Sequence, residues 1–414
     1  MEEKLLPKIR YSDYRDVWKV SLLTEQVEIR RGLTYKPSDL RNNGVRVLRS
    51  SNIVEDAFVL SDDDVFVYEG AVNIPKIKNG DILVTAANGS VRLVGKHAIV
   101  KNIEDEDNVV HGGFMLAFKA KQNYFVNAWM SSEEFQRVLQ FVQGGNGAIG
   151  NLSSTILRNI KMSIPSASEQ SAIGSLFWAL DDLLTSYKDN LANYQSLKVT
   201  MLSKMFLKAG QTVPEIRLDG FEGEWGEWKL SEISQKVTEK NKDNIFSETF
   251  TNSAEFGIIS QRDFFDKDIS NENSLNTYYV VRNNDYVYNP RISNFAPVGP
   301  IKRNKLGRTG VMSPLYFVFR VTNSNIDLNF LEKFFDTNTW HKFMKLNGDS
   351  GARADRFAIK DSVFLNMPIP IPSLPEQQAI GAYFSNLEQL ITSYQEKITQ
   401  LETLKKKLLQ DMFI

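Results

Sequence analysis

The sequence contains no cysteine, and this absence excludes disulfide bonds, thiolate metal sites and cysteine nucleophiles. Histidine is scarce as well: His97, His111 and His341 are scattered without the spacing of metal ligands, so a histidine-based metal or catalytic site is not expected. Neither a secretory signal nor an apolar run long enough to span a membrane is present. We therefore predict a cytoplasmic protein that holds no metal and does not contact a membrane.

Acidic residues are missing from two long stretches of a chain whose net charge is nearly balanced, at −1. Residues 82–103 contain three basic residues and no acid, and residues 286–320 contain six basic residues and no acid. The overall charge does not indicate a nucleic-acid partner. The uneven distribution is more informative, because a local concentration of positive charge attracts a polyanion even when the whole chain is neutral.

One segment of the sequence occurs twice, at a constant offset of 207 residues that is half of the 414-residue length. The first copy covers residues 164–207 and the second covers residues 371–414, and about 19 of these 44 positions are identical. Both copies begin with Ile-Pro-Ser, continue through Glu-Gln and Ala-Ile-Gly, and close with Met-Phe. The repeat unit is therefore half of the protein.

Each copy predicts a long helix with a narrow apolar seam. Ser166 with Glu169, and Ser373 with Glu376, fit the capping box that satisfies the first backbone N–H groups of a helix. Behind each cap, apolar residues recur every seven positions over three to four heptads, which is typical of a coiled coil. The residues expected at the helix-pair interface are Phe177, Leu180, Leu184, Tyr187, Leu191, Tyr194, Phe384, Leu387, Ile391, Tyr394, Ile398 and Leu401.

A seam along a helix of roughly 40 residues, about 60 Å long, has to be buried. The partner that we favour is the other copy, because both copies lie in one chain. The pair is expected to be antiparallel, since a two-fold relation between the halves places one globular half at each end of the rod. Two alternatives stay open: each helix packs on its own half, or the helices pair in a dimer.

The segments between the repeated parts predict strands, loops and short helices, including one helix over 127–143 and another over 329–344. The starts of the halves are also related, because Trp18-Lys19 matches Trp228-Lys229 after a shift of three residues. We predict an α+β fold of two pseudo-symmetric domains joined by two long antiparallel coiled-coil helices. The predicted segments are a first domain over 1–163, a helix segment over 164–209, a second domain over 210–370 and a helix segment over 371–414.

No catalytic motif emerges from the sequence. Gly145–Gly150 matches G-x-G-x-x-G, but a predicted helix precedes it and no βαβ unit follows, which favours a flexible glycine loop near a ligand over nucleotide binding. Tyr288–Arg291 resembles the Asn-Pro-Pro-aromatic motif with which amino-methyltransferases hold a flipped base, but the second proline and the aromatic residue are missing. With no P-loop and no convincing nuclease cluster, no site of chemistry is visible in this chain.

The repeated Ile-Pro-Ser-x-x-Glu-Gln-x-Ala-Ile-Gly helix, following a variable domain in each half, resembles the specificity subunit of type I restriction–modification systems. The resemblance covers essentially the full chain. The family pattern usually has a second proline before Glu-Gln; Pro375 supplies it in the second copy, whereas Ser168 stands there in the first. The two variable segments are then expected to be target-recognition domains.

The resemblance implies a non-catalytic subunit that binds double-stranded DNA. Each domain would recognise one half of a split, asymmetric site, and the helix pair would set the spacer between the halves. The helices would also dock two modification subunits, which bind S-adenosylmethionine and methylate adenine at N6. Restriction subunits, which use ATP and Mg²⁺ for translocation and cleavage, would join that core. The chain itself is expected to hold no cofactor.

For a DNA-binding chain, lysine and arginine provide phosphate contacts, while arginine and asparagine are suited to guanine and adenine edges. For each residue the alternative is a solvated surface side chain. We expect that changing Arg303, Lys305 and Arg308 together to alanine weakens DNA binding and flattens its salt dependence. The candidate DNA contacts are Asn88, Arg92 and Lys96 in the first half and Arg291, Asn294, Lys302, Arg303, Lys305, Arg308, Arg353 and Arg356 in the second.

Two other functions are compatible with parts of the sequence. A coiled-coil scaffold or adaptor without a DNA role explains the long helices but not the two acid-free basic stretches. A methyltransferase fused to recognition domains explains the domains, but the motifs for its cofactor are missing. Attempted crosslinking of S-adenosylmethionine to the isolated chain separates these interpretations, because only the methyltransferase binds it.

Overall fold

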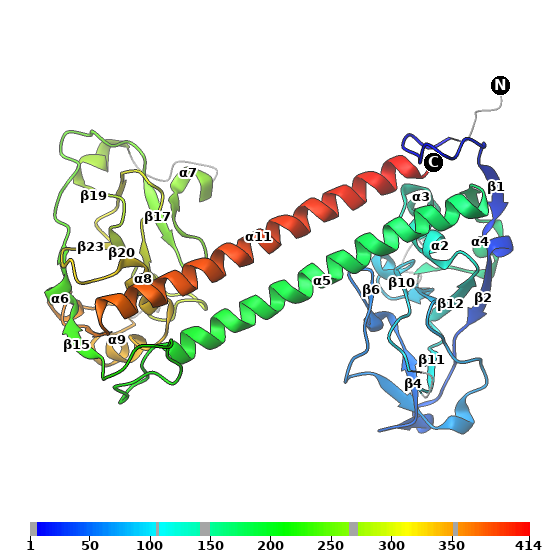
Figure 1. Cartoon of the computed structure of the whole chain (residues 1–414), viewed down its shortest axis with the longest axis horizontal. Coiled ribbons are helices and arrows are strands. Elements are labelled where there is room, and N and C mark those ends of the chain that lie inside the picture. The colour runs from blue at the N-terminus through cyan, green and yellow to red at the C-terminus, as the bar shows by residue number, and fades with distance from the viewer. Residues whose placement is uncertain (1–5, 105–106, 141–149, 265–271, 351–354) are drawn as a thin grey trace. The chain divides into compact units, whose positions relative to one another are not determined.

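The computed structural model describes residues 6–104, 107–140, 150–264, 272–350 and 355–414. The chain divides into two compact units: unit 1 comprises Met1–Asn190 with Tyr394–Ile414, and unit 2 comprises Leu191–Ser393 (Figure 1). Each unit thus contains part of both long helices, α5 (Ala167–Met205) and α11 (Leu374–Met412). The boundaries predicted from the sequence follow the ends of these helices, whereas the compact units divide each helix near its middle.

Unit 1 is built around an antiparallel sheet with the strand order β10-β8-β12-β2, beside a second sheet with the order β11-β4-β7-β3. Its remaining strands form the pairs β1–β14, β13–β9 and β5–β6. The strands are β1 (Lys19–Leu22), β2 (Val27–Arg31), β3 (Leu40–Arg41), β4 (Val45–Leu48), β5 (Ile53–Val54), β6 (Ala57–Phe58), β7 (Val65–Val67), β8 (Ile82–Thr85), β9 (Ala87–Asn88), β10 (His97–Ile99), β11 (Val109–His111), β12 (Met115–Ala120), β13 (Gly150–Asn151) and β14 (Lys161–Ile164). The shorter helices are α1 (Leu23–Gln26), α2 (Asn123–Met130), α3 (Glu133–Gln140) and α4 (Ser154–Asn159).

Unit 2 has a corresponding antiparallel sheet with the strand order β16-β23-β20-β21, and the pairs β15–β24, β17–β18 and β19–β22. The strands are β15 (Gly226–Lys229), β16 (Ser234–Lys236), β17 (Phe250–Ser253), β18 (Gly257–Ser260), β19 (Tyr279–Val281), β20 (Tyr286–Tyr288), β21 (Ile301–Arg303), β22 (Gly310–Met312), β23 (Phe317–Val321) and β24 (Pro368–Ile371). The shorter helices are α6 (Leu230–Ile233), α7 (Gln261–Phe264), α8 (Leu328–Asp336), α9 (His341–Asn347) and α10 (Asp361–Phe364).

The strand registers show that the two units are copies of one fold. Lys19 lies opposite Ile164 in unit 1, and Gly226 lies opposite Ile371 in unit 2, so these strand pairs keep the offset of the sequence repeat. In the central sheets the offset shortens slightly: Phe118 lies opposite Ile82, and their counterparts Phe319 and Tyr286 also lie opposite each other. The α+β fold and the pseudo-symmetry predicted from the sequence are confirmed. Insertions and deletions between the repeated ends therefore shift the register of the repeat there.

The shift that we inferred at the start of the second half is wrong. The indole of Trp18 packs edge-on against Phe413, with ring centroids 6.3 Å apart, and the indole of Trp225 packs in the same way against Phe206 at 6.3 Å. Trp225 occupies the position of Trp18 in the repeat and is buried like it, whereas Trp228 lies on strand β15 with a partly exposed ring. The sequence comparison paired Trp18-Lys19 with the similar dipeptide Trp228-Lys229. In the structure the equivalent of Trp18 is Trp225, because its indole has the same buried contacts.

The glutamate of each repeated motif pairs with an arginine from the start of its half. The Arg10 guanidinium donates two hydrogen bonds of 2.7 Å to the carboxylate of Glu169, and the Arg217 guanidinium donates bonds of 2.8 and 2.7 Å to that of Glu376. The capping box was therefore only half right: the Ser166 hydroxyl accepts from the backbone N–H of Glu169 at 3.4 Å, but both carboxylates bind arginine.

The glutamine and the glycine of the motif hold the first turns of each long helix in position. The side-chain amides of Gln170 and Gln377 each donate a 3.0 Å hydrogen bond to the carbonyl of the motif proline. The motif glycine allows the helix to approach its neighbour closely, since a Cβ at Gly174 would lie 2.7 Å from the backbone nitrogen of Phe125 in α2. At Gly381 a Cβ would lie 2.7 Å from an Asp327 carboxylate oxygen. The repeated sequence thus specifies a helix start that is held against its own domain by hydrogen bonds and close packing.

The two long helices pack antiparallel in each unit. In unit 1 the contacts along α5 and α11 run from Phe177–Phe413, with centroids 5.8 Å apart, to Tyr187–Tyr394 at 5.2 Å. An ion pair of 2.6 Å joins Lys405 of α11 to Asp181 of α5.

Unit 2 has the counterpart of that ion pair, Lys198–Glu388, also at 2.6 Å, and the ring contact Phe206–Phe384 at 6.2 Å. The predicted antiparallel helix pair is confirmed. All twelve predicted seam residues are buried or half-buried: Phe177, Leu180, Leu184, Tyr187, Leu191, Tyr194, Phe384, Leu387, Ile391, Tyr394, Ile398 and Leu401.

Two predicted single helices are each split in the structure. The predicted helix over 127–143 begins earlier and consists of α2 and α3, separated at Ser131-Ser132, and residues 141–149 lie outside the described residues. The helix predicted over 329–344 consists of α8 and α9. At both breaks a hydroxyl satisfies the last turn, because Ser132 Oγ donates to the Trp129 carbonyl and Thr337 Oγ1 to the Phe334 carbonyl. Such side-chain hydrogen bonds occupy backbone carbonyls that would otherwise accept from the next turn, and so favour the end of the helix.

Burial of His97 makes unit 1 sensitive to acid. The ring is buried, with Nδ1 2.9 Å from the Gly95 carbonyl and Nε2 3.1 Å from the Ser131 hydroxyl and 3.2 Å from the Asn127 carbonyl. Burial lowers the pKa of His97, so the unfolded chain binds more protons below the ordinary value of about 6.5. The neutral His97 ring therefore stabilises unit 1 above about pH 6.5. As the pH falls below that value, the free energy of unfolding decreases by up to about 1.4 kcal/mol per pH unit.

We expect the His97→Gln variant to lose less stability than the original chain between pH 7.5 and 5, measured by urea unfolding at each pH. Burial also lowers the pKa of His111, so a smaller slope remains in the variant. Equal slopes for the two proteins would show that His97 is not the group that takes up the proton.

Candidate nucleic-acid interface

Each unit has a cleft beside the turn that leads into the equivalent strand of its central sheet, β12 or β23, and this turn is the part of the lining that the two clefts share. In unit 1 the cleft lies where β8 gives way to β9 and where β12 begins, and its volume is about 670 Å³. In unit 2 it lies beyond β20 and at the start of β23, with a volume of about 910 Å³. Apart from the shared turn, different segments line the two clefts, so their side chains differ.

The unit 1 cleft is lined by glycines, apolar side chains and a few polar groups. Asn88 lines it from β9; its side-chain amide donates to the Ser50 hydroxyl at 3.3 Å, and its carbonyl oxygen accepts from the backbone N–H of Ser90 at 3.0 Å. Arg49 also lines the cleft and donates to the Asp63 carbonyl at 3.1 Å. These bonds hold an amide and a guanidinium, two groups that read base edges, at the mouth of the cleft.

The unit 2 cleft is larger, more aromatic and flanked by two arginines. Its buried wall includes Tyr288 stacked on Phe364, with ring centroids 5.0 Å apart. Arg291 and Arg356 form a backbone bridge beside it, and both side chains are exposed. This bridge corresponds to the β9–β13 pair of unit 1, in which Ala87 lies opposite Asn151. Unit 2 thus carries two cations where unit 1 has an alanine and an asparagine.

The acid-free stretch of unit 2 is not a free positive surface, because acids from other parts of the unit neutralise most of it. The guanidinium of Arg303, only 7% exposed, forms an ion pair with Glu332 at 2.6 Å and donates to the Asn329 side chain at 2.6 Å. Lys305 also pairs with Glu332, at 3.1 Å. Arg308 donates two hydrogen bonds of 2.8 Å to the Glu248 carboxylate. These cations already have partners, and the buried Arg303 is a framework residue.

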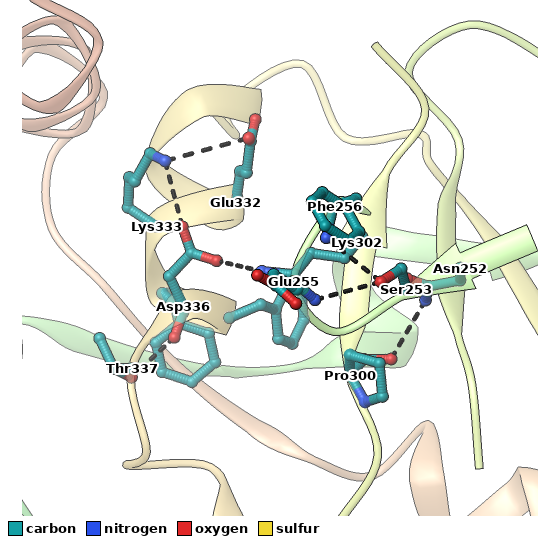
Figure 2. Close-up of polar contacts among 12 residues, drawn as sticks. Asn252, Ser253, Glu255, Phe256, Pro300, Lys302, Glu332, Lys333, Asp336 and Thr337 are labelled. Carbon is teal, nitrogen blue, oxygen red and sulfur yellow. Dashed lines mark hydrogen bonds and ion pairs between the residues drawn. The ribbon is translucent and has the colours of Figure 1, made fainter. Parts of the chain in front are cut away.

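Lys302 belongs to a second network, which is centred on a buried lysine. Figure 2 shows Asp336 between Lys302 at 2.7 Å and Lys333 at 3.1 Å. Lys333 is only 3% exposed and also donates to Glu388 of α11 at 2.6 Å, which pairs in turn with Lys198 of α5. The network therefore connects strand β21 and helix α8 to both long helices.

The charges in this network hold one another ionised. Burial by itself would lower the pKa of Lys333, but the carboxylates of Asp336 and Glu388 outweigh it, so the pKa lies above the ordinary lysine value. Conversely, burial would raise the pKa of Asp336, but Lys302 and Lys333 lower it. A buried charge with such partners is structural, since each partner is needed to compensate for lost hydration.

The other predicted DNA contacts differ in their accessibility. Arg92, Arg291, Asn294 and Arg356 are exposed. Among the described residues, none of the three arginines is part of an ion pair of 4 Å or less. The ammonium group of Lys96 instead donates to the Ile53 carbonyl within unit 1. Arg353 lies outside the described residues.

Sequence reasoning missed three residues at the clefts. Arg49 lies outside the acid-free stretches, and nothing in its local sequence distinguishes it. Phe114 and Leu315 are exposed apolar residues, 69% and 59% accessible, in turns at the cleft rims. Their signal was present in the sequence as a large apolar residue directly after Gly113 or Pro314, where a turn usually carries a polar side chain.

Two further searches cover the described part of the chain. No group of three or more histidine, aspartate or glutamate side chains there has an arrangement that could hold a metal ion. Within the same residues, every helix is too short or too polar to cross a bilayer.

Comparison with known proteins relates both halves of the chain to one family. Residues 15–193 and 222–403 each match the family described as type I restriction modification DNA specificity domain. Over 192 residues the chain is 26% identical to the type I restriction enzyme MjaVIII specificity subunit of Methanocaldococcus jannaschii, a match that spans 44% of each protein.

Solved structures of such subunits align with nearly the whole chain. The type I restriction–modification S subunit from M. genitalium shares the fold, with a TM-score of 0.60 at 12% identity, covering 99% of both chains. The HsdS subunit from Thermoanaerobacter tengcongensis matches more loosely, with a TM-score of 0.42 at 16% identity, covering 96% of both chains.

Proposed function

Because this chain belongs to the family of type I restriction–modification DNA specificity domains, we propose that each of its units reads one half of a bipartite DNA site. DNA sequence recognition within a restriction–modification system is the role of the family. The observation that carries the proposal for this chain is that each unit has a cleft beside the equivalent turn, one lined by Asn88 and Arg49 and the other flanked by Arg291 and Arg356. Clefts that share one turn but differ in their other side chains suit two half-sites of different sequence.

We further propose that the helix pair of α5 and α11 serves as the spacer element and as the platform for other subunits. The support is that α5 and α11 pack antiparallel within each unit and are joined there by an ion pair, Asp181–Lys405 in unit 1 and Lys198–Glu388 in unit 2. Two modification subunits that methylate adenine at N6 would bind S-adenosylmethionine, and restriction subunits would use ATP and Mg²⁺. This chain would contribute recognition alone and no catalytic group.

The test is base-resolved methylation sequencing of host DNA with and without this chain, its modification partner being present in both. We expect N6-methyladenine on both strands of one split motif, and only in the presence of the chain. The motif then identifies both half-sites and the spacer. A demonstrably active partner that leaves no chain-dependent mark would overturn the proposal and favour the scaffold role.

The exposed arginines of unit 2 provide a prediction at the level of single residues. We expect the Arg291→Ala and Arg356→Ala double variant, assembled with its modification subunits, to bind its DNA site more weakly than the original complex. If both side chains contact phosphates, the slope of log K against log salt concentration falls by about 1 for each lost contact. Fluorescence anisotropy at several salt concentrations measures both quantities.

The matched control is Arg308→Ala, which also removes an exposed arginine of unit 2. Arg308 is already neutralised by Glu248, so its loss should change the affinity and the salt slope little. The triple change of Arg303, Lys305 and Arg308 is a poorer test, because it also breaks the buried Arg303–Glu332 pair and therefore alters the fold. Equal affinities of the double variant and the original complex would remove Arg291 and Arg356 from the interface.

A further inference from the structure

The same tight turn lies at the rim of both clefts and carries an apolar side chain at its tip. In unit 1 the turn is Gly112–Met115, closed by a 2.8 Å hydrogen bond from the Met115 N–H to the Gly112 carbonyl. In unit 2 it is Ser313–Tyr316, closed by a 3.0 Å bond from the Tyr316 N–H to the Ser313 carbonyl. Both turns lead into equivalent strands of the central sheets, β12 and β23, and keep the same offset as the paired residues of those strands.

The third residue of each turn is the exposed one. It is Phe114 in unit 1, with 69% of its surface accessible, and Leu315 in unit 2, with 59% accessible. Isolated apolar residues on a protein surface need no explanation. A large apolar residue at the same tip in two units whose intervening sequences have diverged does need one, because turn tips ordinarily carry polar side chains or glycine.

The backbone below each tip is rigid. In unit 1 the N–H of Gly112 donates to the Leu48 carbonyl at 2.9 Å, and the Phe114 carbonyl accepts from Ala86 and Ala87 at 2.9 and 3.1 Å. A Cβ at Gly32 would lie 1.9 Å from the Gly112 carbonyl oxygen, so the neighbouring strand approaches the turn as closely as a glycine permits.

In unit 2 side chains, rather than backbone hydrogen bonds, hold the turn in place. Pro314 restricts the second residue of the turn, the Ser313 hydroxyl accepts from the N–H of Leu315 at 3.4 Å, and the Tyr316 hydroxyl lies 3.2 Å from that of Thr251. Both tips are therefore held in one orientation before any ligand arrives, which reduces the entropy lost on binding.

The tips lie next to the polar groups proposed to contact DNA. Phe114 lines the same cleft as Asn88 and Arg49, and Leu315 lines the same cleft as Arg356. An apolar side chain brought against base edges in the major groove finds one apolar group there, the C5-methyl of thymine, because the other groups are hydrogen-bond donors and acceptors. Placing the tip against those polar groups would leave them without partners.

We propose that Phe114 and Leu315 are specificity residues, each of which recognises the C5-methyl group of a thymine in the half-site read by its own unit. This inference rests on the proposed function and deepens it, since it assigns one class of base contact to a named residue in each unit. The arginines and the asparagine then supply polar contacts, while the two turn tips supply the apolar contact.

The test combines the removal of each tip with the removal of the methyl group. Complexes of the original chain, Phe114→Ala and Leu315→Ala with the modification subunits are titrated with the bipartite duplex that methylation sequencing identifies. The thymines of one half-site at a time are replaced by deoxyuridine, which lacks only the methyl. In each half-site, replacement of the one thymine whose methyl group the tip contacts should reduce the affinity of the original complex about fourfold.

The decisive quantity is whether removal of the side chain abolishes the effect of removing the methyl group. The Phe114→Ala complex should be insensitive to the replacement in the half-site of unit 1 and remain sensitive to it in the other half-site, and Leu315→Ala should show the reverse. The controls Val54→Ala and Ile245→Ala also remove exposed apolar side chains, 50% and 73% accessible, from units 1 and 2. Both controls should keep the full sensitivity of the original complex.

Two results would overturn the inference. Unchanged sensitivity to deoxyuridine in both tip variants would show that the methyl is not read by these residues. Enhanced fluorescence of 2-aminopurine in the bound half-site, lost in the tip variants, would show instead that the tips unstack a base step. In either case specific binding by the original complex keeps the proposed function intact, whereas absence of that binding refutes the proposed function itself.

Discussion

Replacing Lys333 by methionine is expected to destabilise unit 2 by about 3 to 5 kcal/mol, because the change leaves buried carboxylates without a central partner. Lys333 is 3% exposed and pairs with Asp336 at 3.1 Å (Figure 2). It also pairs with Glu388 at 2.6 Å. Methionine fills a similar volume, so the loss reports on charge rather than on a cavity.

The measurement is urea unfolding of the whole chain, followed by circular dichroism. Lys305→Met is the matched control, since it removes the same charge from a neighbouring pair with Glu332 in which the lysine is 54% exposed. An exposed pair of this kind contributes at most about 1 kcal/mol. Equal losses in the two variants would mean that the network around Lys333 is no more important than a surface ion pair.

Glutamine in place of Glu169 or Glu376 is expected to cost about 3 to 5 kcal/mol in the unit that contains it, because each change leaves an arginine without its buried counter-charge. The carboxylates of Glu169 and Glu376 are 1% and 2% exposed, and each accepts two charge-assisted hydrogen bonds from one guanidinium. Since the two sites are equivalent, the two losses should be similar.

Limited proteolysis of the variants, read by mass spectrometry, assigns the destabilisation to a unit. Cleavage should increase in the part of unit 1 that precedes Leu191 for Glu169→Gln, and within Leu191–Ser393 for Glu376→Gln. The control is Glu215→Gln, which removes a carboxylate that is 38% exposed and pairs with Lys208. Unaltered resistance in both Glu169→Gln and Glu376→Gln would show that the arginine pairs do not hold the helix starts in place.

The helix pair was predictable from the sequence because its signal is local and periodic. Residues seven apart in each copy, such as Leu387 and Tyr394, share one face of a helix whatever the remainder of the chain does. The duplication then identified the partner, since two equal seams in one chain can bury each other. The same reasoning anticipated the α+β units, although not the helix breaks at Ser131-Ser132 and Thr337.

The accessibility of the basic residues was not predictable, because it depends on acids far away in the sequence. Arg308 is neutralised by Glu248, which lies 60 residues earlier, and Lys302 by Asp336, which lies 34 residues later. An acid-free stretch therefore says little about the charge of the surface that it forms. The equivalence of the turns Gly112–Met115 and Ser313–Tyr316 was not detectable in the sequence, since the offset between equivalent residues shortens in the middle of each half.

The last residues of the described chain lie in the core of unit 1. Met412 and Phe413 are buried there against Trp18, Phe125 and Phe177, whereas every residue of unit 2 precedes Tyr394. During translation the segment Met1–Asn190 therefore leaves the ribosome without part of its own core. At about 5 to 20 residues per second, the missing helix follows roughly 10 to 40 s later. Unit 1 thus starts before unit 2 but is completed after it, and until then the apolar surface that Met412 and Phe413 cover is exposed, which favours aggregation.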